Sequence, residues 1–374
     1  MRFLHISDLH LGKKLHDRSL LDDQKQVLDR LALDCVAEKI EAVLIAGDIY
    51  QNSMPSEEAM ELFDQFLTNL VKNNIRVYMI SGNHDSDVRI SYFASLIRSA
   101  GIYTSEAFGG VLQSIQVSVE PKIVIHMLPF IKPIHVRRFY CEEKIESYED
   151  AVRTVLDHSP IESDAVNILM CHQTVLGASR CDSEEQVIGG VENIDPHVFD
   201  AFDYVAMGHI HGEQSVGRDE VRYSGSLLKY SLSEMNHKKC AIVVDVKGKG
   251  EIEISKLPYL EPHTMREVRG TLSEIMDMPF SLDYVRVILT DELVVPDAAN
   301  QITQIFPNRL EFRIENSKSK ESDVEMETVD VEQKTPVELF DELYRSQNND
   351  VSLSEEHIRI LNEILEEMNG EDSL

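Results

Sequence analysis

The sequence has no tryptophan, few basic residues and no long apolar segment. Its 374 residues include 36 Lys and Arg against 66 Asp and Glu, so the formal charge at pH 7 is −30. No apolar stretch approaches the roughly 20 residues that a membrane-spanning helix needs. The first residues interrupt their apolar run with His5 and Asp8, unlike a secretory signal. We therefore expect a soluble chain without membrane association, long enough for two or three domains.

Cysteine is also scarce, and its spacing excludes a disulfide framework. The five cysteines lie far apart, are odd in number and form no Cys-x-x-Cys pair. This pattern is typical of reduced thiols in a cytosolic protein. The positions are Cys35, Cys141, Cys171, Cys181 and Cys240.

The excess of acidic residues argues against simple binding to polyanions. A surface of net charge −30 repels DNA and anionic membranes. Divalent cations, local basic loops or a basic partner would have to supply the attraction.

Short apolar runs alternate with amphipathic stretches over the first 260 residues, which predicts an α/β fold. The runs at 3–6, 42–46, 76–80 and 167–170 are typical of buried strands. Helical spacing of leucines predicts a helix within residues 20–40. Pro55 is expected in the first turn of the next helix. Closely spaced strand patterns within 111–128 and 240–257 favour antiparallel additions and a core of two layered sheets.

The remaining chain divides into three parts by composition. The composition predicts a small α+β capping domain over residues 261–315. It predicts a flexible acidic linker over residues 316–335 and two short amphipathic helices over residues 336–374. These helices either fold back on the body or lay their apolar side chains on a partner. Those side chains are Leu339, Phe340, Leu343, Tyr344, Ile358, Leu361 and Leu365.

Five polar fragments each follow an apolar run. Open α/β sheets gather their sites at the carboxyl ends of their strands, so fragments far apart in sequence can converge. Together they offer carboxylate, imidazole and amide ligands, which suit Mn, Fe or Zn. Each fragment alone is weak evidence, but the ordered set predicts a metal site. The fragments are Asp8–Leu9–His10, Gly47–Asp48, Gly82–Asn83–His84–Asp85, Cys171–His172 and Gly208–His209–Ile210–His211, and we expect their glycines to bring the backbone near a phosphate.

This ordered set resembles the calcineurin-like metallophosphoesterase superfamily over residues 1–257. The resemblance implies a double β-sandwich flanked by helices, with two divalent metal ions at the strand ends. It implies one ion held by Asp8, His10 and His211, a second held by Asn83, His172 and His209, and Asp48 bridging both.

The resemblance also assigns the residues that act on the phosphate. His84 would contact the phosphate and protonate the leaving oxygen, and Asp85 would orient His84. The ions would acidify a water that attacks phosphorus in line. Some relatives carry a second histidine shortly after the bridging aspartate, where this chain has Gln51 and Asn52.

Within the superfamily, the chain resembles the SbcD family of nuclease subunits. The opening segment, residues 1–15, the fragment Tyr223–Ser224–Gly225–Ser226 and the domain layout carry this likeness. It implies a manganese-dependent exonuclease and endonuclease that acts on double-stranded DNA ends and hairpins in repair, recombination and replication. It places the protein in the bacterial cytosol at the nucleoid.

The same likeness implies two protein contacts. The C-terminal helices would grip an SbcC-type coiled-coil ATPase, and residues 91–98 would contribute to a homodimer, giving a heterotetramer with the ATPase. The apolar side chains of residues 91–98 fit a protein core equally well.

Three basic clusters follow the motifs and either contact DNA phosphates or form an ordinary solvated face. They are Lys13, Lys14 and Arg18; Lys132, Arg137 and Arg138; and Lys238 and Lys239. The alternative functions are a stand-alone phosphoesterase acting on small phosphodiesters or phosphomonoesters, and a scaffold with vestigial metals.

Overall fold

The structure is a computed structural model of the 374-residue chain. It describes residues 1–184, 193–293, 295–315, 340–341, 344–345, 352–354 and 356–361. The chain forms two compact units. One comprises Met1–Ile288 with Val295–Arg313, and the other comprises Leu289–Val294 with Ile314–Leu374.

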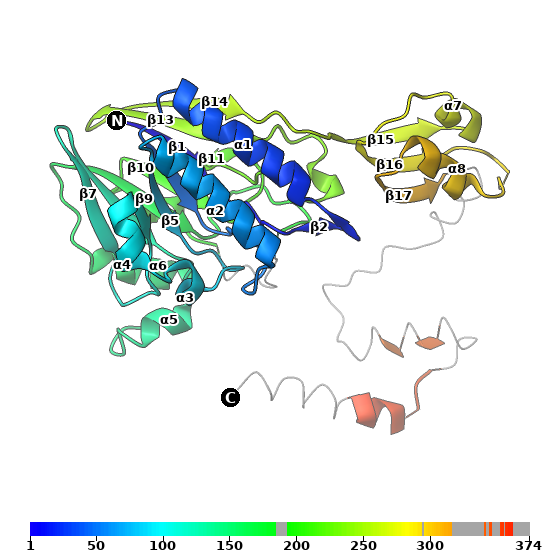
Figure 1. The fold of residues 1–374 in the computed structure, drawn as a ribbon. Coiled ribbons are helices and arrows are strands. Elements are labelled where there is room, and N and C mark those ends of the chain that lie inside the picture. Colours follow the sequence, from blue (N-terminus) through cyan, green and yellow to red (C-terminus); the bar gives the residue numbers. More distant parts are fainter. Residues whose placement is uncertain are drawn as a thin grey trace. The chain divides into compact units, whose positions relative to one another are not determined.

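Two six-stranded sheets form the body of the first unit (Figure 1). The first has four parallel strands and an antiparallel edge, in the order β14 (Glu251–Pro258), β13 (Cys240–Gly248), β1 (Arg2–Ile6), β4 (Ala42–Ala46), β5 (Arg76–Ile80) and β6 (Ile102–Thr104). The second has the order β11 (Gln214–Val216), β12 (Arg218–Tyr223), β10 (Tyr204–Gly208), β9 (Val166–His172), β8 (Lys122–Leu128) and β7 (Gln113–Val119). Its two edge strands, β7 and β11, are antiparallel to their neighbours.

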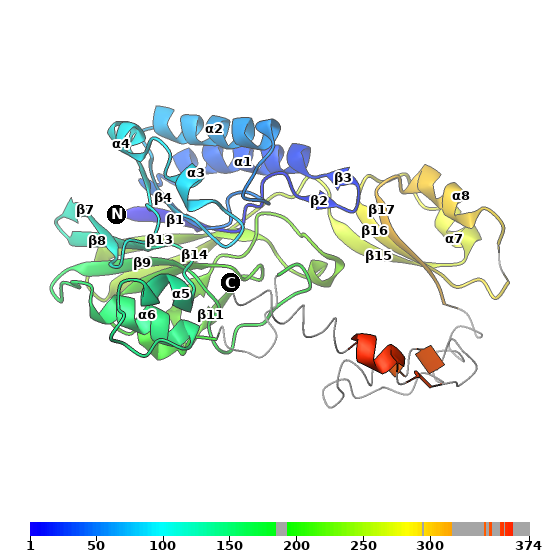
Figure 2. The same ribbon diagram turned by 90° about the horizontal axis from the view of Figure 1, so that it is seen from below.

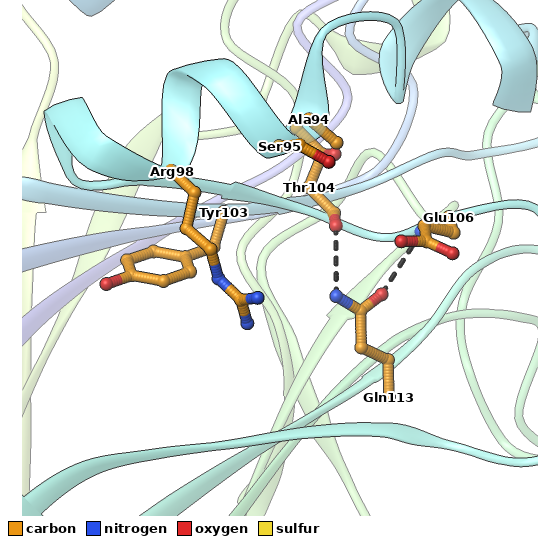
Figure 3. A pocket seen from close by; sticks show the side chains of 7 residues that line it. All are labelled: Ala94, Ser95, Arg98, Tyr103, Thr104, Glu106 and Gln113. Atoms are coloured by element: carbon orange, nitrogen blue, oxygen red, sulfur yellow. Dashed lines mark hydrogen bonds between the residues drawn. The ribbon is translucent and has the colours of Figure 1, made fainter.

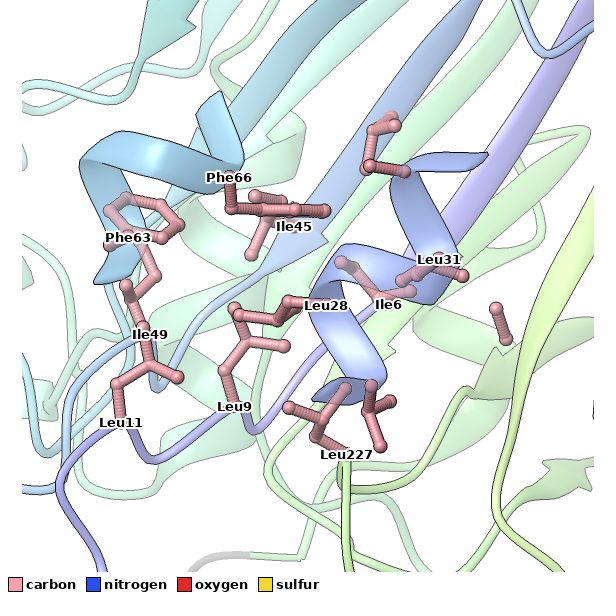
Figure 4. Close-up of a cluster of buried hydrophobic side chains, with 14 of the residues drawn as sticks. Ile6, Leu9, Leu11, Leu28, Leu31, Ile45, Ile49, Phe63, Phe66 and Leu227 are labelled. Carbon is pink, nitrogen blue, oxygen red and sulfur yellow. The ribbon is translucent and has the colours of Figure 1, made fainter. Parts of the chain in front are cut away.

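The alternation of side chains along the strands produces the layers. In β4, Ala42 and Leu44 face the other sheet, whereas Val43 and Ile45 face the helices. Both faces of the strand are therefore buried, which explains its continuous apolar run. Figure 4 shows Ile45 beside Phe66, with Leu28 in the same cluster of buried side chains between sheet and helices.

Helices cover the outer faces of both sheets. Figure 2 shows α1 (Leu21–Ala37) and α2 (Glu57–Lys72) on one side, and α5 (Pro133–Arg137) and α6 (Tyr148–Asp157) on the other. The two sheets and their helices confirm the predicted α/β sandwich. The remaining short elements of this body are β2 (Lys14–Leu15), β3 (Arg18–Ser19), α3 (Asp87–Ile90), α4 (Ala94–Ile97) and the 3-10 turns η1 (Arg98–Ala100), η2 (Pro196–Phe199) and η3 (Leu232–Glu234).

The predicted place of Pro55 is wrong. Helix α2 begins at Glu57, and Ser56 is its N-cap, whose hydroxyl accepts a hydrogen bond from the amide of Ala59 at 3.3 Å. Pro55 thus precedes the cap, because a serine satisfies a free amide of the first turn better than a proline does.

A three-stranded sheet follows the sandwich, with β15 (Met265–Gly270), β16 (Tyr284–Leu289) and β17 (Arg309–Ile314). Helices α7 (Leu272–Met276) and α8 (Ala298–Ile305) accompany it. Polar contacts join it to the body: the Asp23 carboxylate lies 2.9 Å from His263 Nδ1 and accepts from the Tyr284 hydroxyl at 3.1 Å.

Parts of the predicted helical pair belong to the second unit. Residues 340–341, 344–345 and 356–361 are helical, and the rings of Tyr344 and His357 lie 5.7 Å apart. Phe340, Tyr344 and Leu361 line an apolar pocket between these turns. Ile358 is exposed, whereas Leu339, Leu343 and Leu365 lie outside the described residues, as does the predicted linker 316–335. The division of the chain at residues 260, 315 and 335 stays a prediction.

Among the residues that the structure describes, no helix combines the length and the apolar character that crossing a bilayer requires.

Candidate metal centre

The five polar fragments all stand at carboxyl ends of parallel strands in the two sheets. Asp8 and His10 follow β1, Asp48 follows β4, and Asn83–Asp85 follow β5. From the second sheet, His172 ends β9, and His209 and His211 follow β10. Backbone contacts bind these loops together, since the amide of His209 donates to the Asp8 carboxylate at 3.0 Å. The predicted convergence of distant fragments therefore occurs in the structure.

One ligand group gathers around His10. Its Nε2 lies 3.1 Å from Nε2 of His211 and 3.6 Å from Oδ2 of Asp48. Asp8 offers an oxygen within 4.8 Å of the ring nitrogens of His10 and His211.

A second ligand group gathers around Asn83. Its Oδ1 lies 3.1 Å from His172 Nε2 and 3.0 Å from His209 Nδ1. The same Oδ2 of Asp48 that faces His10 lies 3.4 Å from His172 Nε2. Asp48 thus stands between the two groups, where the sequence analysis places a bridging ligand.

The donor set fits divalent metal ions. Ligands about 2.1 Å from one ion and at right angles to each other lie about 3 Å apart, which matches the ring and amide spacings above. The donors are imidazole nitrogens, carboxylates and one amide oxygen, a mixture suited to Mn, Fe or Zn. The ligand assignments themselves stay a prediction.

Burial sets the charges of these side chains. It lowers the pKa of His209 to about 3 and that of His10 well below its usual value, so both rings are neutral. Burial also works against the charged forms of Asp48 and His172. Their mutual attraction outweighs it, so the pKa of Asp48 falls well below its usual range and that of His172 rises to about 9. A metal ion bound by His172 would take the place of this proton, because an imidazole binds a metal only in its neutral form.

The backbone at the site is strained. Asp8, His10, Asp48 and His209 have positive φ angles of 52°, 43°, 49° and 99°. Residues other than glycine rarely adopt this region, which costs on the order of 1–3 kcal/mol each. Such strain persists only where the surrounding structure enforces it, and it concentrates at functional sites.

The motif glycines make room for the ligand residues, and their approach to a phosphate stays a prediction. A Cβ on Gly47 would collide with the His172 ring, and one on Gly82 would collide with the Asp48 carboxylate. A Cβ on Gly208 would collide with the carbonyl oxygen of Ala46. Glycine is required at these positions because the ligand residues pack directly against its backbone.

His84 lies at the rim of the cluster, half-buried, with Nε2 4.0 Å from Asp48 Oδ2. The prediction that Asp85 orients His84 is wrong. The carboxylate of Asp85 accepts from the amides of Ile49, Tyr50 and Gly82 at 2.9–3.0 Å. The His84 ring instead places Nδ1 3.0 Å from the carbonyl oxygen of Gln51. Asp85 therefore ties together the loops that follow β4 and β5.

The predicted DNA-binding lysines and arginines differ in environment. Lys239 is buried, and its Nζ donates to the Glu234 carboxylate at 2.5 Å, so it is not a DNA contact. Arg18 donates to Pro307 and Asn308 of the three-stranded segment. Lys13 is half-buried, 5.6 Å from the centre of the Tyr230 ring. The exposed members are Lys14, Arg18, Lys132, Arg137, Arg138 and Lys238.

No pattern in the sequence points to the residues that surround His211. Ser183 Oγ lies 2.7 Å from His211 Nδ1, and the Glu184 carboxylate accepts from the His211 amide at 2.7 Å. Burial raises the pKa of the nearby Cys181 thiol to about 12, so this cysteine is protonated. No motif marks these residues, because a loop and a 3-10 turn far apart in sequence supply them.

A small pocket lies away from the cluster, between α4–η1 and strands β6 and β7 (Figure 3). The Gln113 amide spans it, donating to the Thr104 carbonyl oxygen at 3.3 Å and accepting from the Glu106 amide at 3.1 Å. None of the predicted metal or catalytic residues lines this pocket.

Comparisons with known proteins agree with this geometry. Residues 1–213 match the family model described as calcineurin-like phosphoesterase. A curated relative from Staphylococcus epidermidis, named as the D subunit of the nuclease SbcCD, is 32% identical over 318 residues, which cover 83% of this chain and 84% of the relative. The chain belongs to the SbcD family of calcineurin-like phosphoesterases. Membership confirms the predicted resemblance, the fold class and the class of enzyme, a hydrolase of phosphate esters that binds divalent metal ions.

Three further matches concern the C-terminal part of the chain and the fold. Residues 261–348 match the family model described as type 5 capsule protein repressor C-terminal domain. A dimetal phosphatase of Danio rerio is 12% identical, with a TM-score of 0.40, over 70% of this chain and 99% of that one. A protein of Thermus thermophilus is 10% identical, with a TM-score of 0.39, over 68% of this chain and 98% of that one. These TM-scores are too low for either solved structure to support a conclusion about this chain.

Proposed function

We propose that this chain is the metal-dependent DNA nuclease subunit of an SbcCD-type ATPase–nuclease complex. One observation carries the proposal: two groups of nitrogen and oxygen donors share Asp48 Oδ2, at 3.6 Å from His10 and 3.4 Å from His172. The similarity to a relative named as part of the nuclease SbcCD supports DNA as the substrate.

The chain's own residues would hold two divalent ions, and manganese is the ion that the family resemblance implies. Asp8, His10 and His211 would hold one ion, Asn83, His172 and His209 the other, and Asp48 both. A bound pair of ions lowers the pKa of water and neutralises charge on a phosphate.

His84 is the proposed proton donor for the leaving oxygen. Its ring is half-buried beside the ligands, with its centre 4.9 Å from that of His10. The hydrogen bond from Nδ1 to the carbonyl oxygen of Gln51 holds Nε2 toward Asp48, on the side where a phosphoester would bind.

Partners follow from the same family. The C-terminal helices would bind the coiled coil of an SbcC-type ATPase through apolar side chains that include Phe340 and Ile358, both exposed. Tyr92, Phe93 and Leu96 are exposed as well, which supports the homodimer interface over the alternative of a core position. Activity on DNA ends and hairpins would place the complex at the bacterial nucleoid.

The test uses purified wild-type chain and Asp48→Asn on end-labelled linear and hairpin DNA with manganese. Parallel reactions contain p-nitrophenyl phosphate and bis-p-nitrophenyl phosphate. We expect DNA cleavage that requires metal and is lost in Asp48→Asn, because the variant disturbs both ligand groups. Turnover of the small esters with DNA intact, even after addition of the ATPase partner, would contradict the proposal and favour a stand-alone phosphoesterase.

A further inference from the structure

His211 differs from His172 in what holds its second ring nitrogen. His172 donates Nδ1–H to a backbone carbonyl, that of Ala46, at 2.8 Å. His211 instead places Nδ1 2.7 Å from a side chain, the hydroxyl of Ser183. A side-chain partner can be removed by substitution, whereas a backbone carbonyl cannot.

The hydrogen-bond directions around Ser183 determine the tautomer of His211. The Ser183 hydroxyl donates its proton to Oε1 of Glu234 at 2.6 Å. Its oxygen must therefore accept from the ring, which puts the proton of His211 on Nδ1. The lone pair of Nε2 is then free on the side of His10 and Asp8, as a metal ligand requires.

The Glu234 carboxylate is itself held in place. It is fully buried, and it accepts from the Tyr230 amide at 3.0 Å through Oε1 and from Lys239 Nζ at 2.5 Å through Oε2. Lys239 also donates to the carbonyl oxygen of His211 at 2.9 Å. Cys181, His211 and Glu234 lie close enough to hold an ion of their own. Lys239 already neutralises Glu234, so this group serves as support and not as a further metal site.

We propose that Ser183 and Glu234 are positioning residues that fix the tautomer and orientation of His211 and so set the metal affinity of the group Asp8, His10 and His211. This inference rests on the proposed function, since it assigns His211 as a ligand. Partners of this kind change metal affinity by about 10–100-fold in other proteins.

The experiment measures Mn²⁺ binding to the full chain by isothermal titration calorimetry, without substrate. We expect Ser183→Ala to weaken one of two Mn²⁺ sites at least about tenfold and to leave the other unchanged. Ser183→Thr keeps the hydroxyl and should restore affinity. Glu234→Gln, which keeps the shape of the side chain but not its charge, should weaken the same site.

Two controls separate positioning from general loosening. Ser233→Ala removes a hydroxyl that accepts from the Asp182 amide at 3.0 Å without touching His211, and it should bind Mn²⁺ as wild type does. In a His211→Ala background, Ser183→Ala should cause no further loss. Wild-type affinity in Ser183→Ala, an equal loss in Ser233→Ala, or a loss that persists without His211 would overturn the inference. A wild-type chain that binds no Mn²⁺ would overturn the metal centre itself.

Discussion

Asp48 is the residue on which both ligand groups depend. Its Oδ2 faces His10 and His172, while its Oδ1 accepts from the His84 amide at 2.9 Å. In the sequence, Asp48 stands out as part of Gly47–Asp48, one of the five polar fragments. The motif does not reveal the positive φ of Asp48 or the hydrogen bond to His84, because both depend on loops that meet only in the folded chain.

A substitution of His84 can distinguish an effect on catalysis from an effect on metal binding. We expect His84→Ala to retain two Mn²⁺ ions but to cleave DNA about 10²–10⁴-fold more slowly, the usual contribution of a general acid. Metal content and single-turnover cleavage are measured together. His197→Ala, which alters an exposed histidine on η2, is the control. Full turnover in a His84→Ala variant that still binds both ions would exclude the assigned role.

His5 predicts a pH dependence of stability. It lies between the sheets, with Nδ1 2.9 Å from the Tyr204 hydroxyl and Nε2 3.1 Å from the Met207 carbonyl oxygen, and burial lowers its pKa to about 3. In the unfolded chain the pKa of His5 is about 6.5, so below that pH His5 binds a proton that it does not bind in the folded chain. His5 therefore makes the free energy of unfolding fall as the pH drops from about 6.5 toward 3.

Urea unfolding at several pH values measures this effect. His5→Gln should be less stable at pH 7, because it disturbs contacts between the sheets, yet lose less stability on acidification than wild type. His197→Gln should follow the wild-type curve. An unchanged slope in His5→Gln would show that His5 does not titrate in this way.

At the scale of elements, strand ends bring the site together. The short apolar runs predict β1, β4, β5 and β9 because strands buried on both faces must be apolar throughout. The two-residue strands β2 and β3 escape prediction, since they are too short for any periodicity. Pro55 is a misleading signal because the start of α2 is set by the hydrogen bond that the Ser56 hydroxyl accepts. The fixed φ of the proline does not set it.

The close contact between β10 and β4 predicts the effect of a single methyl group. Gly208→Ala would push a Cβ against the Ala46 carbonyl and the His172 ring. We expect a loss of about 1–3 kcal/mol in the free energy of unfolding, as for other overpacked sites, together with weaker Mn²⁺ binding. Gly248→Ala is the matched control, since the nearest atom to its Cβ would be 3.9 Å away. Equal stability of the two variants would contradict the packing described here.

At the scale of the whole molecule, the net charge is −30, and basic side chains offset it only near their own positions. The sequence indicates the acidity but not which basic residues are available, because burial of Lys239 and the contacts of Arg18 depend on tertiary structure. The placement of the C-terminal helices on a partner likewise cannot be derived from one chain, since their apolar side chains suit either a partner or the body.

The exposed apolar side chains of residues 91–98 predict self-association. Tyr92, Phe93 and Leu96 are 66%, 57% and 68% exposed, an arrangement that a second copy of the chain would cover. We expect a dimer in light scattering at micromolar concentration and a monomer for Leu96→Asp. Val119→Asp, at an exposed position on β7, should remain dimeric. A monomeric wild type would exclude this interface.

Anomalous diffraction from crystals of the full chain grown with Mn²⁺ would locate the metal ions directly. We expect two manganese peaks that share the Asp48 carboxylate, one beside His10 and His211 and the other beside Asn83, His172 and His209. A single peak, or peaks that leave Asp48 uncoordinated, would contradict this prediction.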